Sequence, residues 1–149
     1  MEWLVEVVGL TILLALIVPL LWLYLRRRWL SRQGGIFDCA MRPVEHTEWA
    51  LGLARYEGEH LEWYRALSLS LRPKVRFRRT ATSAVEQREA EYGEVESLYG
   101  NPRVVRLSIS NRVPRDPAGD WELAMAPESS TGLLSWLEAA PPSVGRFRQ

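Results

Sequence analysis

Residues 61–71 read LEWYRALSLSL, and apolar and polar side chains alternate along this stretch. The apolar side of the alternation holds Leu61, Trp63, Leu67, Leu69 and Leu71, together with Arg65. A period of two is typical of a half-buried β-strand, because successive side chains of a strand point to opposite faces. The stretch therefore predicts one long strand, with Trp63 in the core of a mainly-β domain.

The residues before this stretch predict its partner strand. Residues 49–54 alternate in the same way, and Glu57-Gly58-Glu59 separates the two segments. Two alternating segments joined by a short turn with a glycine are typical of a β-hairpin. Further alternating segments predict about seven strands in all; they are residues 36–41 (ended by Pro43), 75–78, 83–89, 105–110 and 121–125, with a weak candidate at 94–99.

After Pro127 the apolar period changes to three and four residues. Leu133, Trp136, Leu137 and Ala140 form one face of a short helix, which residues 129–131 cap and Pro141-Pro142 end. About seven antiparallel strands followed by a closing helix is the order of a small pleckstrin-homology-like barrel, although other small β-domains also end in a helix. Trp136 is accordingly expected in the core.

The N-terminal residues differ from the rest of the chain. Residues 7–25 contain no charged side chain, and as a helix these 19 residues span about 28 Å. This length is close to the roughly 30 Å of a bilayer core, and residues 3–5 extend it. Trp3 at one end and Trp22, Tyr24 and Trp29 at the other suit interfacial aromatic belts. The segment predicts a transmembrane helix over residues 3–25.

The charges beside the apolar run predict its orientation. Positive charges follow the run, at Arg26, Arg27, Arg28 and Arg32, whereas Glu2 and Glu6 precede it. A cleaved signal peptide has the opposite arrangement, and positive flanks stay on the cytoplasmic side. We therefore expect a single-pass plasma-membrane protein with the N-terminus outside. The expected parts are a basic juxtamembrane segment (26–33), a cytoplasmic β-barrel-like domain (34–142) and a flexible tail (143–149).

Composition and motifs indicate a protein without catalytic chemistry. The formal net charge of +1 gives no support for nucleic-acid binding, and Cys39 is the only cysteine, so no internal disulfide forms. Cys39 is expected to be a small buried apolar residue. Neither His46 nor His60 has a metal-site spacing, and no nucleophile motif or phosphate-binding glycine loop occurs. We expect no enzyme activity, no cofactor and no metal.

One charged stretch is a candidate binding surface. The cations Arg72, Lys74, Arg76, Arg78 and Arg79 lie within eight residues, and an acidic run of Glu86, Glu89, Glu91, Glu94 and Glu96 follows. Two solvated faces that pair across strands explain both runs. The alternative is contact of the basic residues with anionic lipid headgroups or another membrane protein, since the anchor holds the domain near the bilayer.

Three segments resemble a known family. GGIFDCAMR (34–42), LARYEGEHLEWYRALSLSLRPK (53–74) and ELAMAPESSTGLLSWLEAAPP (122–142) are similar to the actinobacterial domain of unknown function 2550. The resemblance implies a single-span membrane protein, often encoded beside ATP synthase genes, with no established activity. The sequence thus predicts a membrane-anchored, non-enzymatic interaction domain. The alternatives are an accessory subunit of a larger membrane complex, associated with ATP synthase for example, and a small enzyme with no recognisable motif.

Overall fold

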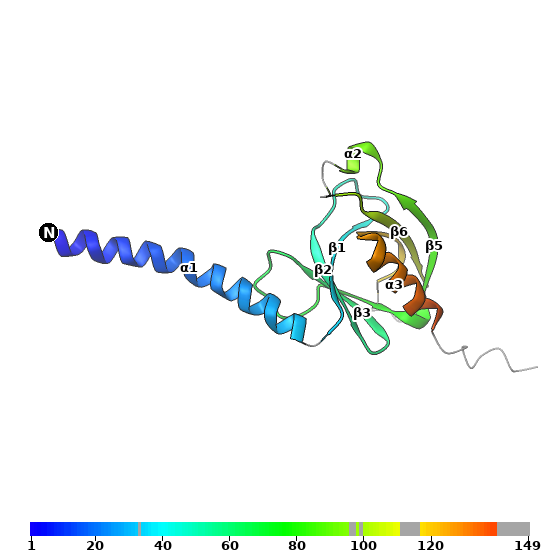
Figure 1. Ribbon diagram of the computed structural model, residues 1–149, viewed down its shortest axis with the longest axis horizontal. Coiled ribbons are helices and arrows are strands. Elements are labelled where there is room, and N and C mark those ends of the chain that lie inside the picture. The colour runs from blue at the N-terminus through cyan, green and yellow to red at the C-terminus, as the bar shows by residue number, and fades with distance from the viewer. Residues whose placement is uncertain (33, 96–97, 99, 111–116, 140–149) are drawn as a thin grey trace, which may run out of the picture.

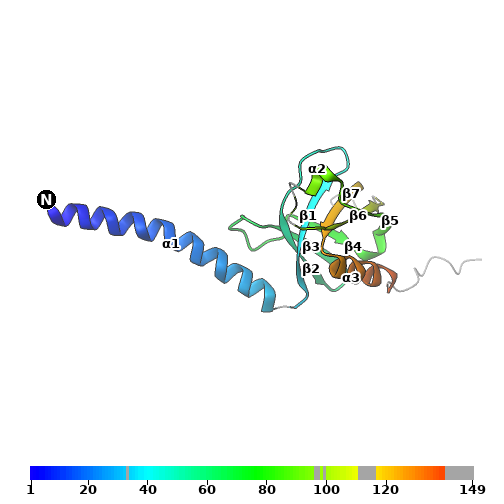
Figure 2. The ribbon, with the colours of Figure 1, turned by 45° about the horizontal axis from the view of Figure 1, so that its top comes forward.

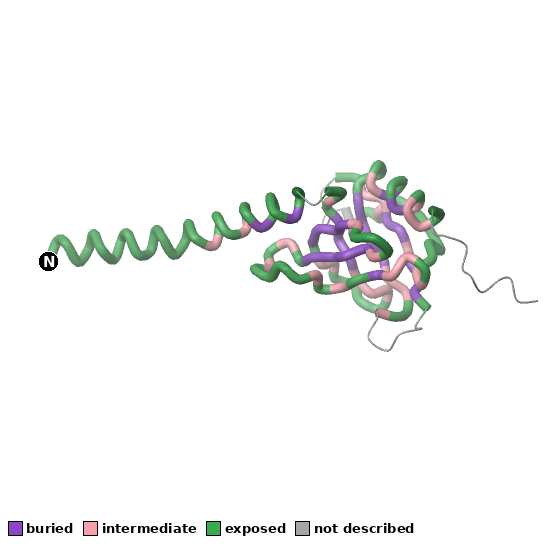
Figure 3. Tube along the Cα trace, turned by 90° about the horizontal axis from the view of Figure 1, so that it is seen from below, coloured by how far each residue is buried: buried purple, intermediate pink, exposed green. Residues whose placement is uncertain are grey.

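The computed structural model describes residues 1–32, 34–95, 98, 100–110 and 117–139. A long N-terminal helix, α1 (Glu2–Arg32), extends from a β-rich domain (Figure 1). Its apolar part is exposed along its length, and only Arg26 and Leu30, near its C-terminal end, are buried (Figure 3). The helix is long and apolar enough to cross a membrane.

The domain is built on one seven-stranded antiparallel sheet. Its strands are β1 (Ile36–Pro43), β2 (Gly52–Glu57), β3 (His60–Arg65), β4 (Val75–Arg78), β5 (Thr82–Glu89), β6 (Arg103–Ile109) and β7 (Gly119–Met125), in the order β4-β3-β2-β1-β7-β6-β5. The two halves of the sheet meet at β1, because its first residues pair with β2 and its last with β7. Figure 2 shows the strands bending around the interior.

The seven strands, their antiparallel pairing and the C-terminal helix α3 (Pro127–Glu138) confirm the predicted fold class. Among the described residues the sheet is not closed into a barrel by hydrogen bonds, since β4 and β5 are its two edges. The α3 helix instead packs on β5 and β6 (Figure 1). This arrangement is compatible with a pleckstrin-homology-like fold.

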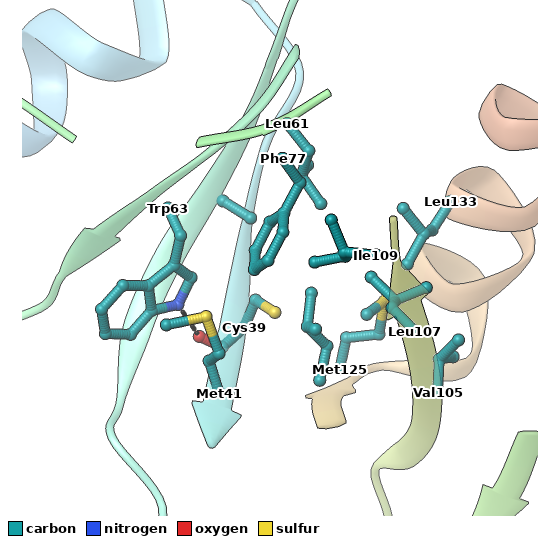
Figure 4. Packing of buried hydrophobic residues seen from close by; sticks show 12 residues of the cluster. Cys39, Met41, Leu61, Trp63, Phe77, Val105, Leu107, Ile109, Met125 and Leu133 are labelled. Atoms are coloured by element: carbon teal, nitrogen blue, oxygen red, sulfur yellow. Dashed lines mark hydrogen bonds between the residues drawn. The ribbon is translucent and has the colours of Figure 1, made fainter. Parts of the chain in front are cut away.

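The core lies between the bent sheet and α3. Trp63 is 1% exposed, and its indole Nε1 donates a hydrogen bond to the carbonyl oxygen of Cys39 at 2.8 Å (Figure 4). Leu133 of α3 is fully buried against this cluster. Trp136 is only partly buried, and the centre of its ring lies 5.1 Å from the centre of the Tyr56 ring. The prediction for Trp63 is confirmed, whereas Trp136 lies at the margin of the core.

The strand predicted over residues 61–71 is shorter than its sequence pattern. β3 ends at Arg65, because β4 pairs only with residues 60–63 and the chain then leaves the sheet. Leu67, Leu69 and Leu71 are 83%, 57% and 40% exposed. They belong to the loop between β3 and β4, the leucine loop (residues 66–74). Three carbonyls of this loop accept hydrogen bonds from α1. Its two end residues, Ala66 and Lys74, donate backbone hydrogen bonds to Leu51 and Trp63.

Two other local predictions are wrong. The weak strand predicted at residues 94–99 is preceded and overlapped by a short helix, α2 (Tyr92–Val95), and part of it lies outside the described residues. The α3 helix begins at Pro127, two residues before the predicted cap at 129–131, and its N-cap Ala126 makes no side-chain capping bond. Proline suits the first helical position because its missing N–H has no partner there in any case. The Ser130 hydroxyl donates to the Pro127 carbonyl instead. The predictions for Ala140 and for the tail lie outside the described residues.

Candidate functional site

The helix and the domain meet at a junction formed by the last turns of α1, β3 and the leucine loop. The loop lies beside α1 where the uncharged run ends, as the tube in Figure 3 shows. The leucine loop follows Arg65, the last residue of β3. The part of α1 that it contacts includes Arg26, the first of the clustered arginines. The junction therefore determines how the domain is held against the helix.

Arg26 is the central side chain of the junction. It is 4% exposed, and its guanidinium donates to the carbonyl oxygens of Ser70 (2.7 Å), Arg65 (3.2 Å) and Ala66 (3.4 Å). Hydrogen bonds from a charged donor contribute about 1.5–3 kcal/mol. One arginine thus orders the turn in which the chain leaves β3, and these contacts form the Arg26 clamp.

Trp22 adds a second contact one helical turn before Arg26. Its indole Nε1 donates to the Leu69 carbonyl oxygen at 3.1 Å. Residues four apart lie on the same helix face, so Trp22, Arg26 and the buried Leu30 together form the face of α1 that meets the domain. The orientation of the domain about the helix axis is fixed by this face.

A buried polar network lies behind the clamp on β2 and β3. The Arg26 guanidinium lies 6.0 Å from the centre of the Tyr64 ring. The Tyr64 hydroxyl donates to a Glu62 carboxylate oxygen at 2.7 Å, and Arg55 donates to the same oxygen at 2.7 Å. Arg76 pairs with the other Glu62 oxygen at 3.1 Å. The clamp therefore rests on a paired network and not on an isolated charge.

The network shifts the pKa values of its members. Burial acts to raise the pKa of Glu62, but the hydrogen bonds from Arg55 and Tyr64 outweigh it and lower that pKa. Burial, together with the hydrogen bond to the Glu62 carboxylate, raises the pKa of Tyr64 to about 12. At neutral pH the network thus holds an ionised carboxylate and a protonated phenol, which is a structural arrangement.

The four arginines that were predicted to set the membrane topology have different surroundings. Arg26 is buried in the clamp, so it is not a freely exposed flanking charge. Arg27 forms an exposed ion pair with Asp38 at 3.5 Å. Arg28 and Arg32 are exposed. The sequence showed four equivalent charges, but the helix phase gives them three different roles.

The five basic residues from Arg72 to Arg79 are not gathered into one patch. Arg72 and Lys74 are exposed in the leucine loop, whereas the other three belong to β4 or follow it directly. Arg76 pairs with Glu62, and Arg79 donates to Glu59 at 3.0 Å while lying 5.2 Å from the Trp136 ring. Arg78 is half-buried at the end of β4. Arg72 and Lys74 are the members of this set that belong to the leucine loop.

The structure contains a second cluster of buried charges, which the sequence pattern did not predict. Arg88 bonds Glu94 at 2.7 Å and Glu122 at 2.7 Å, and Arg42 bonds Glu94 at 2.9 Å. The hydrogen bonds from Arg88 lower the pKa of Glu94 to about 2. Glu94 was expected on a solvated acidic face, but it fixes α2 against the sheet. The four residues come from four segments, and no spacing in the sequence connects them.

The residues with reactive side chains are not brought together. Cys39 is buried in the core, where burial raises the pKa of its thiol, and His46 lies in an exposed loop. Among the described residues no three His, Cys, Asp or Glu side chains gather as a metal site would require. A hollow of about 730 Å³ extends from Phe37 past Leu51 to Ala126. Asp38 and Cys39 are the ionisable side chains among its described lining residues.

Comparisons with known proteins give a family and no activity. The model of a family described as "Protein of unknown function (DUF2550)" matches residues 13–143. Uncharacterized protein Rv1312 of Mycobacterium tuberculosis is 31% identical over 125 residues, which are 82% of this chain and 82% of that protein. Uncharacterized protein ML1147 of Mycobacterium leprae is 30% identical over 125 residues, with the same shares. No solved structure matches the chain.

Proposed function

The chain belongs to this DUF2550 family, and we propose that it is a membrane-anchored, non-enzymatic protein that presents a pleckstrin-homology-like interaction domain at the membrane surface. Its helix α1 would cross the plasma membrane once, with the N-terminus outside and the domain in the cytoplasm. The domain would bind another protein of the same membrane. Tethering raises the effective concentration of the domain near such a partner.

The observation that carries this proposal is the Arg26 clamp. A flexible tether would leave the domain free to rotate, and it would need no contact between helix and domain. Here a buried arginine and a tryptophan of α1 bond four backbone carbonyls of the domain. A helix that carries its domain in one orientation is what a surface-presented binding module requires.

The leucine loop supports the membrane placement. Of its exposed leucines, Leu69 bonds Trp22 through its carbonyl and Leu71 lines the same hollow as Trp22, at the end of the uncharged run. Exposed apolar side chains gathered on one surface are characteristic of a protein or membrane contact. At this position along α1 the neighbouring medium is the boundary between lipid chains and headgroups, which accommodates leucine and tryptophan together.

The orientation is tested with reporters fused after Gln149. A reporter that is active only in the cytoplasm should work, and one that is active only outside it should not. Replacing Arg26, Arg27 and Arg28 by glutamine should give mixed orientations, because Arg32 alone supplies a weak bias. Strong activity of the external reporter on the wild-type chain would contradict the cytoplasmic placement.

The interaction function is tested by photo-crosslinking in the native membrane. A crosslinking amino acid replaces Val85 or Tyr92, two large exposed side chains of the domain that lie outside the leucine loop. A discrete adduct with one membrane protein should form, and Arg26→Gln should reduce its yield, whereas Arg27→Gln should not. Adducts with several subunits in fixed ratio would identify an accessory subunit. No adduct from either position would contradict the interaction function.

A further inference from the structure

A second hollow of the described structure lies between α1 and the leucine loop. It has a volume of about 460 Å³ and is open on one side. Its lining residues are Trp22, Leu25, Arg26, Arg28, Trp29, Arg32 and Leu71. All but Leu71 come from the last three turns of α1. This hollow, the junction groove, is therefore formed mainly by the helix, and the leucine loop adds one side chain.

The helical spacing places apolar and basic side chains on the same side of α1. Leu25, Arg28, Trp29 and Arg32 follow one another at three, one and three residues, which gathers them on one face. Leu25 belongs to the uncharged run, whereas Arg28 and Arg32 lie one and two turns beyond it. The junction groove is therefore apolar at one end and cationic at the other.

The cationic end is free to bind an anion. Arg26 is committed to the loop carbonyls, but Arg28 and Arg32 are exposed, and within the described part of the chain neither forms an ion pair. No carboxylate lines the groove. Arginine binds phosphate through two parallel hydrogen bonds, and two arginines one turn apart can hold one phosphate between them.

We propose that the junction groove binds one anionic phospholipid. The phosphate lies between Arg28 and Arg32, and an acyl chain lies along Trp22, Leu25 and Leu71. The direction of the groove matches a lipid in a bilayer, because its apolar end points toward the middle of the uncharged run and its cationic end toward the domain. The inference rests on the membrane placement proposed above and adds a partner of defined chemistry.

The experiment measures lipid binding to the full-length protein in a non-ionic detergent. The probes are phosphatidylglycerol and, as the zwitterionic reference, phosphatidylcholine, with native mass spectrometry to count bound lipids. Wild type should retain one phosphatidylglycerol in preference to phosphatidylcholine. The double variant Arg28→Gln, Arg32→Gln should bind phosphatidylglycerol about 25-fold more weakly, since each cation near an anionic lipid contributes roughly fivefold in affinity.

A matched double variant, Arg27→Gln with Arg65→Gln, removes the same charge from two exposed residues outside the groove. It should bind phosphatidylglycerol within about twofold of wild type. Equal losses of phosphatidylglycerol affinity in both double variants would contradict lipid binding in the junction groove. Equal binding of the two lipids by wild type would contradict it as well. Failure of the membrane placement itself is recognised separately, because the chain would then be released from native membranes by an alkaline wash.

Discussion

β3 and the leucine loop continue one alternating pattern, yet they lie in opposite surroundings. In β3, Leu61 and Trp63 are each 1% exposed and pack in the core, whereas Leu67 and Leu69 are more than half exposed. The change occurs at Arg65, the last residue of β3, after which carbonyls of the loop accept hydrogen bonds from α1. Glu62 and Tyr64, on the other side of the alternation, are buried as well. Alternation therefore predicts which side chains share a face, but it does not predict what covers each face.

The largest expected effect in this comparison is the loss of Trp63. Replacing Trp63 by alanine removes a fully buried indole and its bond to the Cys39 carbonyl, and such changes cost about 3–5 kcal/mol. This is comparable with the stability of a whole small domain, so the variant should be largely unfolded. The measurement is urea unfolding of the full-length protein in detergent, followed by near-ultraviolet circular dichroism.

Leu67→Ala is the control for that experiment. Leu67 has the same place in the alternation but is 83% exposed, so its replacement should change the free energy of unfolding by less than about 0.5 kcal/mol. A similar loss from both variants would mean that the domain covers the leucine loop after all.

The next effect concerns the residue at which the two regions separate. Arg26→Gln should cost about 1–3 kcal/mol, because the carbonyls of Arg65, Ala66 and Ser70 lose a charged donor. The helix and the domain should then move independently. Spin labels at Thr11 and Val85, two exposed positions on the two parts, should give a narrow distance distribution in wild type and a broad one in the variant.

Arg27→Gln is the matched control, since its ion pair with Asp38 is exposed and contributes about 0–1 kcal/mol. Its distance distribution should stay narrow. A narrow distribution in Arg26→Gln as well would show that the clamp does not orient the domain.

These comparisons show what the sequence could predict. Periodicity identified the seven strands, the C-terminal helix and the apolar run, because each depends on local spacing. It could not identify Arg26 as a buried clamp, since its carbonyl partners lie about 40 residues away in the chain. Glu94 was hidden for the same reason: its partners Arg42 and Arg88 come from separate strands. Side-chain roles that depend on tertiary contacts have no periodic signal.

A smaller effect is expected from acid, through Glu62 of β3. The pKa of Glu62 is lower in the folded than in the unfolded state, so the folded state binds fewer protons. Glu62 therefore contributes stability above the ordinary pKa of glutamate, about 4.3, and this contribution is lost as the pH falls through the lowered folded pKa. Over this range the free energy of unfolding of wild type should fall by about 1 kcal/mol more than that of Glu62→Gln. Urea unfolding at a series of pH values measures the difference.

Glu57→Gln is the control for the acid effect, because Glu57 lies on the neighbouring strand with its side chain 54% exposed. This variant keeps Glu62 and its hydrogen bonds to Arg55 and Tyr64, so the loss of stability that Glu62 causes in acid should remain. The Glu94 cluster also loses stability in acid, but it does so in all three proteins and cancels in the comparison. Parallel profiles for wild type and Glu62→Gln would contradict a depressed folded pKa.

The smallest effect on stability, and the sharpest test of the comparison, comes from the leucine loop itself. Replacing Leu67, Leu69 and Leu71 by serine should change the free energy of unfolding in detergent by less than about 0.5 kcal/mol for each exposed residue.

The same loop should nevertheless be in contact with lipid, since Trp22 holds Leu69 at the end of the uncharged run. An environment-sensitive fluorophore on Leu69→Cys, in nanodiscs, should therefore be quenched by lipids brominated near the headgroup. A fluorophore on Val85→Cys, an equally exposed position on the far edge strand, should remain unquenched and fully hydrated. The native Cys39 does not interfere, because it is buried. Quenching at Leu69→Cys as weak as that at Val85→Cys would place the leucine loop in water and would contradict its contact with lipid.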